Sequence, residues 1–416
     1  MELQLAKGTR DILPEEMLWR NEILAKAVAV FARFGFLPLE TPTLERFETL
    51  SSKYTGGAEI LKETFQLKDQ GKRDLGLRYD HTVPLARFVG MNSNLKMPFK
   101  RFAVGKVFRD GPIKLGRYRE FWQLDVDIIG AKGMRADAEL LSLTSQLFSE
   151  LGCKPVIKVN NRKLLNGILE QVGIKDKEPA ILSLDKLEKF GRETVFAELE
   201  QKGLSEQVIH SLFDFLTNDL EGLKTIITNE EGLQGIKELE ELFGYLKQLK
   251  VKAEFEVSLA RGLAYYTGTV FEVYLPESEV KSSVAAGGRY DTMIGKLLGS
   301  KLEWPAVGIS FGLDVLADAL PKREQKTTTK LFIIPIHTTE QCFALAHFFR
   351  NSGVNTDLDI VGRSISKNLD YANSQGIPFV LFVGEDELAQ GRLKLRDMGS
   401  GKEELLAKEV ILGRLT

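Results

Sequence analysis

The chain has 416 residues, of which 43% are hydrophobic and 27% charged, and its formal net charge is −2. This is the composition of an ordinary globular protein with two or three domains. The small net charge gives no indication of nucleic-acid binding. Two cysteines far apart in sequence form neither a metal-binding spacing nor a disulfide framework, so we expect a reducing, cytoplasmic location. No apolar run reaches the length of a membrane span, and the N-terminus shows no apolar signal core.

The first 160 residues are predicted to mix one long helix with separate strands. Pro14, Glu15 and Glu16 precede apolar residues at helical spacing, which predicts a helix that ends at Gly35. Strand-like stretches follow at residues 63–68, 75–79, 100–108 and 119–129. Irregular loops join them instead of regular helices, so we expect an antiparallel sheet and not a Rossmann fold. Neither the dinucleotide-binding glycine pattern nor the P-loop pattern occurs.

Residues 163–251 are predicted to be almost wholly helical, from apolar residues spaced by three and four such as Leu164, Ile168, Leu239 and Leu242. They hold 17 acidic and 11 basic residues. The strand pattern resumes at 254–274, which indicates one catalytic domain (1–162 and 252–320) interrupted by a helical insertion (163–251). A polar linker, 321–330, leads to a small α/β domain at 331–416. There we predict strands at 331–335, 356–361, 379–383 and 392–396, and helices at 338–351, 365–374 and 403–412.

A basic stretch precedes a polar strand in the first half of the chain. Residues 100–119 hold seven basic residues and one acidic residue, which indicates a localised site for a polyanion. Arg109 and Arg117 flank a loop, and period-two alternation puts Gln123, Asp125 and Asp127 on one face of the following strand. Arginines suit phosphate recognition and charge stabilisation in nucleotidyl transfer. The alternative is a salt-bridged surface hairpin.

The stretch R-G-L-A-Y-Y-T-G-T-V-F-E-V-Y at 261–274, followed by A-G-G-R-Y-D at 286–291, is the most informative in the chain. Arg261 can hold a carboxylate and a phosphate through its planar fork of donors. Tyr265 and Tyr266 are adjacent, so on a strand one would reach a pocket while the other packs behind it. The alternative is a surface strand with a glycine turn. A further segment, L-R-Y-D-H-T-V-P at 77–84, contains Asp80 and Thr82; we assign its His81 no role.

These segments together resemble the signatures of the histidyl-tRNA synthetase family. The stretch G-R-Y-R-E-F-W-Q at 116–123 is similar to motif 2 of class II aminoacyl-tRNA synthetases, and W-P-A-V-G-I-S-F-G-L-D at 304–314 to motif 3. Residues 35–42 resemble motif 1, and residues 361–372 and 383–388 resemble an anticodon-binding domain. The resemblance covers essentially the whole chain. It implies an α+β class II synthetase core, an antiparallel sheet flanked by helices, with a helical insertion and a C-terminal α/β anticodon-binding domain.

The resemblance also implies an activity and a set of roles. It implies a ligase that activates L-histidine with ATP, accompanied by Mg²⁺, to histidyl-adenylate and transfers it to tRNA(His), and that works as a homodimer. Arg261 and Arg109 would be catalytic, and Arg109 and Arg117 would bind ATP. No protein-bound metal is implied. The expected histidine-binding residues are Asp80, Thr82, Gln123, Asp127, Arg261, Tyr265 and Tyr266.

The chain departs from the family pattern at three positions. Ala264 stands where the family has Asp, Gly111 where it has Glu, and Val315 where motif 3 has an arginine that clamps ATP. A non-catalytic relative that senses histidine, the regulatory subunit of ATP phosphoribosyltransferase, is therefore a second hypothesis. Two features argue against it: that relative typically lacks the arginine at the position of Arg261, and it usually lacks the anticodon-binding domain.

Overall fold

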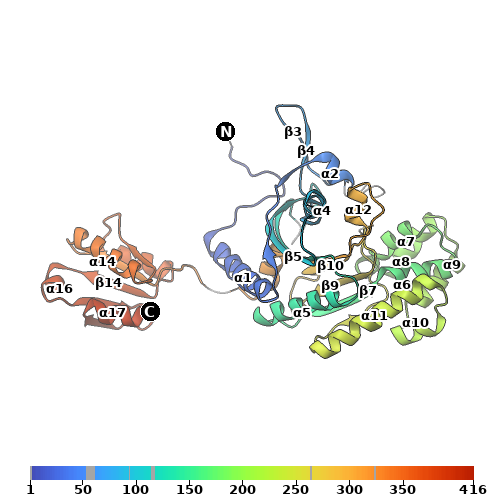
Figure 1. Cartoon of the computed structure of the whole chain (residues 1–416). Helices are drawn as coiled ribbons and strands as arrows, with labels where there is room; N and C mark the ends of the chain where they lie inside the picture. The colour runs from blue at the N-terminus through green and yellow to red at the C-terminus, as the bar shows by residue number, and fades with distance from the viewer. Residues whose placement is uncertain (1, 53–60, 93, 114–117, 263–264, 323–324) are drawn as a thin grey trace. The chain divides into compact units, whose positions relative to one another are not determined.

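The structure is a computed structural model of the whole chain and describes residues 2–52, 61–92, 94–113, 118–262, 265–322 and 325–416 (Figure 1). The chain forms two compact units. The larger comprises residues 1–10 and 22–321, and the smaller comprises residues 11–21 and 322–416. Within the described ranges, every helix is too short or too polar to cross a membrane.

The larger unit is built on an eight-stranded sheet in the order β1-β5-β6-β11-β10-β9-β7-β8. All neighbouring strands run antiparallel except the two outermost pairs, β1–β5 and β7–β8, which are parallel. The predicted antiparallel sheet is thus confirmed. The strands are β1 (Leu37–Pro38), β5 (Phe99–Phe108), β6 (Glu120–Ile129), β7 (Val156–Asn161), β8 (Glu254–Phe255), β9 (Thr269–Tyr274), β10 (Ala285–Arg289) and β11 (Ala306–Gly312).

Helices cover one face of this sheet with an aromatic core. Helix α1 (Pro14–Arg33) ends before Gly35, as predicted, and α5 (Arg135–Glu150) follows β6. Phe31 of α1 packs on Phe102 of β5 and Phe311 of β11, and Phe148 of α5 packs on the other side of Phe311. Burial of these rings in the core stabilises this face of the sheet.

The opposite face carries a smaller layer that encloses the candidate site. A three-stranded antiparallel sheet in the order β2-β4-β3 joins helices α2, α4 and α12. Val83 and Val89 of α4 share a buried cluster with Met293 and Ile294 of α12. The bounds are β2 (Leu44–Arg46), α2 (Phe47–Ser52), β3 (Gln66–Lys68), β4 (Asp74–Leu77), α4 (Thr82–Met91), α12 (Met293–Leu297) and α13 (Leu313–Ala319).

A run of helices leaves the sheet after β7 and returns to it at β8 (Figure 1). The Asn161 side chain caps the first of them by accepting from the Lys163 amide at 2.9 Å. The apolar residues predicted at helical spacing are buried on α6 and α11. The helices are α6 (Arg162–Gln171), α7 (Lys177–Leu184), α8 (Leu187–Gln201), α9 (Glu206–Phe215), α10 (Leu220–Ile226) and α11 (Glu230–Leu249).

The smaller unit contains a five-stranded mixed sheet in the order β13-β12-β14-β15-β16. Its elements lie close to the predicted ones, with three differences. The strand predicted at 356–361 ends at Leu358, the short helix Glu385–Ala389 was not predicted, and a helix was expected over 403–412. Glu403–Leu406 instead forms strand β16, paired antiparallel with β15, and helix α17 begins only at Lys408. The other bounds are β12 (Leu331–Pro335), α14 (Thr339–Asn351), β13 (Thr356–Leu358), α15 (Ile365–Ser374), β14 (Phe379–Val383), α16 (Glu385–Ala389), β15 (Leu393–Asp397) and α17 (Lys408–Leu415).

Candidate active site

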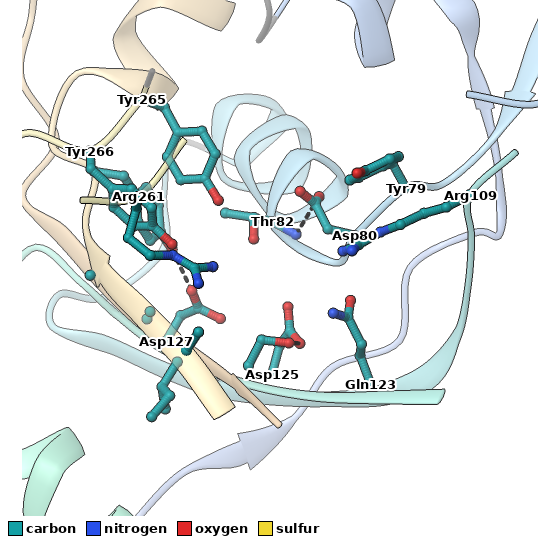
Figure 2. Close-up of a pocket in the computed structure, with 17 residues that line it drawn as sticks. Tyr79, Asp80, Thr82, Arg109, Gln123, Asp125, Asp127, Arg261, Tyr265 and Tyr266 are labelled. Atoms are coloured by element: carbon teal, nitrogen blue, oxygen red, sulfur yellow. Dashed lines mark hydrogen bonds between the residues drawn. The ribbon is translucent and has the colours of Figure 1, made fainter. Parts of the chain in front are cut away.

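A pocket lies over the middle of the large sheet and gathers side chains from segments far apart in sequence (Figure 2). Arg261, Tyr265 and Tyr266 lie toward one end, and Asp80 and Arg109 toward the other, with strand β6 below them. Every predicted site residue that the structure describes lines this pocket. These residues are Asp80, Thr82, Arg109, Gln123, Asp127, Arg261, Tyr265 and Tyr266. Arg117 lies outside the described residues, as does Ala264.

Strand β6 supplies the floor of the pocket through its alternation. Gln123, Asp125 and Asp127 all point to the same face, as period two predicts, and all three line the pocket. Asp125 lies opposite Ser310 of β11 in register and accepts a hydrogen bond from the Ser310 hydroxyl at 2.6 Å. Gln123 Oε1 is buried and has no hydrogen-bond partner among the described residues, which is the condition of an acceptor that a polar ligand would satisfy.

Asp127 is a buried carboxylate of the pocket, 3% exposed. The Arg101 guanidinium pairs with it at 2.8 Å, and the Tyr290 hydroxyl donates to its Oδ1. Burial raises the pKa of Asp127 to about 6, and the opposing charge of Arg101 only partly offsets that effect. Gly308 lies opposite Asp127 on β11 and leaves room for this carboxylate. Asp127 is therefore ionised at neutral pH but lies close to its titration point.

The opposite wall is organised by the start of helix α4 and the end of β5. Asp80 Oδ1 accepts from the backbone amides of Thr82 and Val83, both at 3.0 Å, which caps the helix and fixes the carboxylate. The Arg109 guanidinium lies over the Tyr79 ring, 4.2 Å from its centroid. A stacked, planar guanidinium of this kind keeps its donors in a fixed plane for an anion.

The tyrosine pair does not lie as predicted. Strand β9 begins only at Thr269, and Tyr265 is in a turn before it. The alternation of a strand therefore does not direct the two tyrosine side chains to opposite faces of the sheet. Both rings line the pocket, with centroids 4.6 Å apart, and Tyr265 also meets Tyr290 edge-on at 6.2 Å. The prediction that one of them packs behind the other is wrong. Arg261 likewise precedes the strand, and it is held from β9 by an ion pair with Glu272.

Several lining residues were not among the predicted site residues. Tyr79, Tyr290 and Ser310 line the pocket, as does Asp125, whose place on the β6 face was predicted without a role. The two-residue alternation of the strand was the signal that placed Asp125 on the same face as Gln123 and Asp127. For Ser310 and Tyr290 only the pairing of β11 and β10 with their neighbours brings them to the site, which no local pattern reveals.

The predicted basic stretch at 100–119 is not one continuous surface. Arg101 points inward to Asp127, whereas Lys100 pairs with Glu139 and Lys106 with Glu120. His81 is buried among this group; burial and neighbouring arginines lower its pKa to about 3, so it is neutral. It does not line the pocket, in keeping with the absence of an assigned role. Among the described residues no cluster of His, Cys, Asp and Glu is suited to hold a metal ion.

Comparisons with known proteins cover nearly the whole chain. Residues 8–316 match the family described as histidyl-tRNA synthetase, and residues 330–415 match the anticodon binding domain. "Histidine--tRNA ligase 1" of Bacillus cereus (strain ATCC 10987 / NRS 248) is 46% identical over 413 residues, covering 97% of this chain and 95% of the relative.

Solved structures agree with this match. The histidyl-tRNA synthetase from Nostoc sp. PCC 7120 has a TM-score of 0.84 and 28% identity, and covers 100% of this chain and 99% of its own. A Bacillus halodurans C structure titled as an ATP phosphoribosyltransferase regulatory subunit/histidyl-tRNA synthetase has a TM-score of 0.77 and 24% identity. It covers 92% of this chain and 98% of its own. At that identity the second likeness bears on the fold alone.

Proposed function

The chain belongs to the histidyl-tRNA synthetase family, and we propose that its pocket activates L-histidine with ATP and passes the activated histidine to tRNA(His). The observation that carries the proposal is the pocket itself. It places two arginines, Arg109 and Arg261, around a floor of polar side chains that includes Gln123 and Asp127. Cations on both sides of a polar pocket suit a substrate with a carboxylate and phosphates.

We assign the amino-acid end of the pocket to histidine. Asp127 accepts an imidazole N–H, because it is a buried carboxylate that is ionised at neutral pH. The fixed Asp80 carboxylate faces the substrate ammonium group, and Arg261 faces the substrate carboxylate. Such a site rejects apolar amino acids, because its buried polar groups would be left unpaired. The proposed histidine-binding set is Asp80, Thr82, Gln123, Asp127, Arg261, Tyr265 and Tyr266.

The proposed chemistry is nucleotidyl transfer followed by acyl transfer. The histidine carboxylate attacks the α-phosphorus of ATP in line, and pyrophosphate leaves. Arg109 and Arg261 stabilise the negative charge that develops on the α-phosphate oxygens, and Arg117 holds the γ-phosphate end. The terminal ribose hydroxyl of tRNA then attacks the acyl carbon and displaces AMP. Mg²⁺ enters with ATP as part of the substrate.

The proposed organisation follows the same assignment. Residues 1–162 and 252–320 form the catalytic domain, 163–251 the helical insertion and 331–416 the anticodon-binding domain, joined by a linker at 321–330. The match to an anticodon binding domain at residues 330–415 supports contact with tRNA. We further propose a cytoplasmic homodimer.

A purely histidine-sensing role is less well supported. The chain retains Arg261 at the pocket and matches the anticodon binding domain over residues 330–415. A sensor needs neither of these features, because it performs no nucleotidyl transfer and binds no tRNA. The substitutions at Gly111 and Val315 remain the features that favour it.

Histidine-dependent exchange of pyrophosphate into ATP, measured without tRNA, tests the proposal. We expect exchange that requires histidine and is not supported by other amino acids, followed by charging of tRNA(His) when tRNA is added. Arg261→Lys retains the positive charge but not the planar fork, and should lower exchange strongly. Histidine binding by calorimetry without any exchange would refute the ligase and favour the sensor.

A further inference from the structure

A second cavity, of about 170 Å³, is lined by residues of strands β7 and β9 and of the corner between helices α7 and α8. Glu272, the ion-pair partner of Arg261, lines this second cavity, whereas Arg261 lines the pocket. Arg261 therefore stands at the boundary between the two spaces. Its side chain is 21% exposed and that of Glu272 is 12% exposed.

A chain of polar contacts leads from Arg261 to the helices. Glu272 and Tyr274 lie two residues apart on β9 and so on the same face, and the Tyr274 hydroxyl contacts the Glu272 carboxylate. The same hydroxyl lies 2.7 Å from Glu188 Oε2, and Glu188 Oε1 accepts from Lys158 of β7 at 2.8 Å. We call Glu272, Tyr274, Glu188 and Lys158 the support network of Arg261. Only Glu188 comes from the helices, at the start of α8.

The backbone of the arginine segment is also held in place. The buried Asn160 side chain donates to the carbonyls of Val257 and Leu259, at 2.8 and 2.9 Å. Arg162 donates to the carbonyl of Arg261 at 3.4 Å. Asp185, in the turn between α7 and α8, faces the amide of Gly262; burial raises its pKa, and the nearby Arg261 charge opposes that rise. The backbone at Arg261 is thus held in place, and its guanidinium is positioned by Glu272 of the support network together with the Tyr266 hydroxyl.

We propose that Glu272, Tyr274 and Glu188 are positioning residues for Arg261, through which the first turn of α8, before the kink at Gly191, sets the place of the guanidinium in the pocket. This rests on the function proposed above for Arg261. An arginine has several rotatable bonds, and a charge that must meet a developing oxyanion loses most of its effect when displaced by about 1 Å. Glu272 holds one edge of the fork, and the Tyr274 hydroxyl, which has a single proton to donate, lies between the Glu272 and Glu188 carboxylates and links them. A shift of α8 would therefore move the guanidinium.

The bonding states of the network suit this arrangement. Burial and the charge of Glu272 raise the pKa of Tyr274, so its hydroxyl stays protonated and can donate. Burial acts to raise the pKa of Glu188, but hydrogen bonds from Lys158 and Tyr274 lower it overall, so this carboxylate stays ionised. The Glu188 side chain is 55% exposed, so its substitution leaves the core intact.

The test uses Tyr274→Phe and Glu188→Gln in the full chain, with Glu193→Gln as the matched control. Glu193 is an exposed residue of α8 beyond the non-helical Gly191, which separates it from Glu188, and its substitution makes the same charge change outside the network. We expect kcat of histidine-dependent exchange to fall about tenfold in both network variants, with the KM values for histidine and ATP within about twofold of the wild-type values. The control should match wild type, and thermal unfolding should show all three variants folded.

A double-mutant cycle separates positioning through Arg261 from a general structural effect. In the Arg261→Lys background, measured as single-turnover adenylate formation, Tyr274→Phe should have almost no further effect, because its route to the substrate is already lost. If both network variants had the wild-type kcat while Arg261→Lys was slow, the positioning role would be overturned and the proposed function of the pocket would stand. A full tenfold effect in the Arg261→Lys background would also overturn it. No exchange by the wild-type chain would refute the proposed function, and the inference with it.

Discussion

Gly308 of β11 lies directly opposite Asp127 on the neighbouring strand β6. A single methyl group added at Gly308 should weaken histidine binding. A Cβ at Gly308 would lie 2.8 Å from Asp127 Cγ and closer still to Oδ1, well inside the 3.4 Å at which ordinary contacts begin. The carboxylate must move by more than half an ångström to make room. It cannot do so freely, because Arg101 holds it at 2.8 Å and Tyr290 donates to it.

The size of the effect follows from the hydrogen bond that a displaced Asp127 would no longer make with the imidazole of histidine. Loss of one hydrogen bond to a charged group costs about 1.5–3 kcal/mol, which corresponds to roughly a 10- to 150-fold rise in the histidine KM of Gly308→Ala. Overpacking can lower the stability of the variant by about 1–3 kcal/mol as well. ATP–pyrophosphate exchange titrated with histidine at 15 °C, with circular dichroism on the same samples, separates the two effects.

A Gly→Ala change without contacts is the control. Gly244 lies exposed on helix α11, and a Cβ there would meet nothing within 4 Å. Gly244→Ala should be slightly stabilising, by up to about 1 kcal/mol, and should keep the wild-type histidine KM. A folded Gly308→Ala variant with the wild-type histidine KM would refute the assignment of Asp127 as the imidazole acceptor.

Three other predictions concern titration and packing. The pKa of His81 is lowered from 6.5 to about 3, so the unfolded chain takes up a proton there before the native state does, and the free energy of unfolding falls as pH drops below 6.5. Between pH 8 and pH 5.5, the free energy of unfolding in urea should fall by about 1 kcal/mol less in His81→Gln than in wild type. The Asp127 carboxylate has a pKa of about 6, so it gains a proton as pH falls and loses its charge toward histidine. The ratio of the histidine KM of wild type to that of Asp127→Asn should therefore rise about tenfold from pH 7 to pH 5. A ratio that does not change with pH would contradict this assignment. A Cβ at Gly235 would lie 2.9 Å from the backbone Cα of Leu164, which cannot move aside, so Gly235→Ala should lose about 1–3 kcal/mol in urea unfolding whereas Gly244→Ala on the same helix should not.

Local patterns predicted which residues share a face within a single element. Strand β6 shows this well, because the alternation that puts Gln123 and Asp127 on one face is a property of any strand. The pattern failed at Glu403–Leu406, an edge strand of alternating exposed and half-buried residues. Its strand conformation depends on hydrogen bonding to Leu393–Asp397, a partner that is invisible in the periodicity of the segment itself.

Residues that line the pocket were predicted where a local motif marks them, and missed where only strand pairing brings them to the pocket. Tyr265 and Tyr266 were identified, but their directions were wrong because the strand begins later than its composition indicates. Tyr290 was missed because its contact with Asp127 joins residues 163 positions apart. Spacing within a segment says which residues are available; which of them meet is decided by the pairing of strands β6, β11 and β10.

The division of charge around the pocket bears on what it can bind. Of the cations expected to form one polyanion-binding stretch, Arg101 is 1% exposed and pairs with Asp127 from the neighbouring strand β5, so it is not available to phosphate. Arg109 and Arg261 line the pocket at its two ends, whereas the carboxylates of Asp80 and Asp127 lie between and beneath them. A site that alternates cation and anion in this way disfavours a simple polyanion, because part of that ligand would face a carboxylate. It favours a ligand with a carboxylate and phosphates near the arginines and a cationic amino group near Asp80, which is the charge pattern of an amino acid beside ATP.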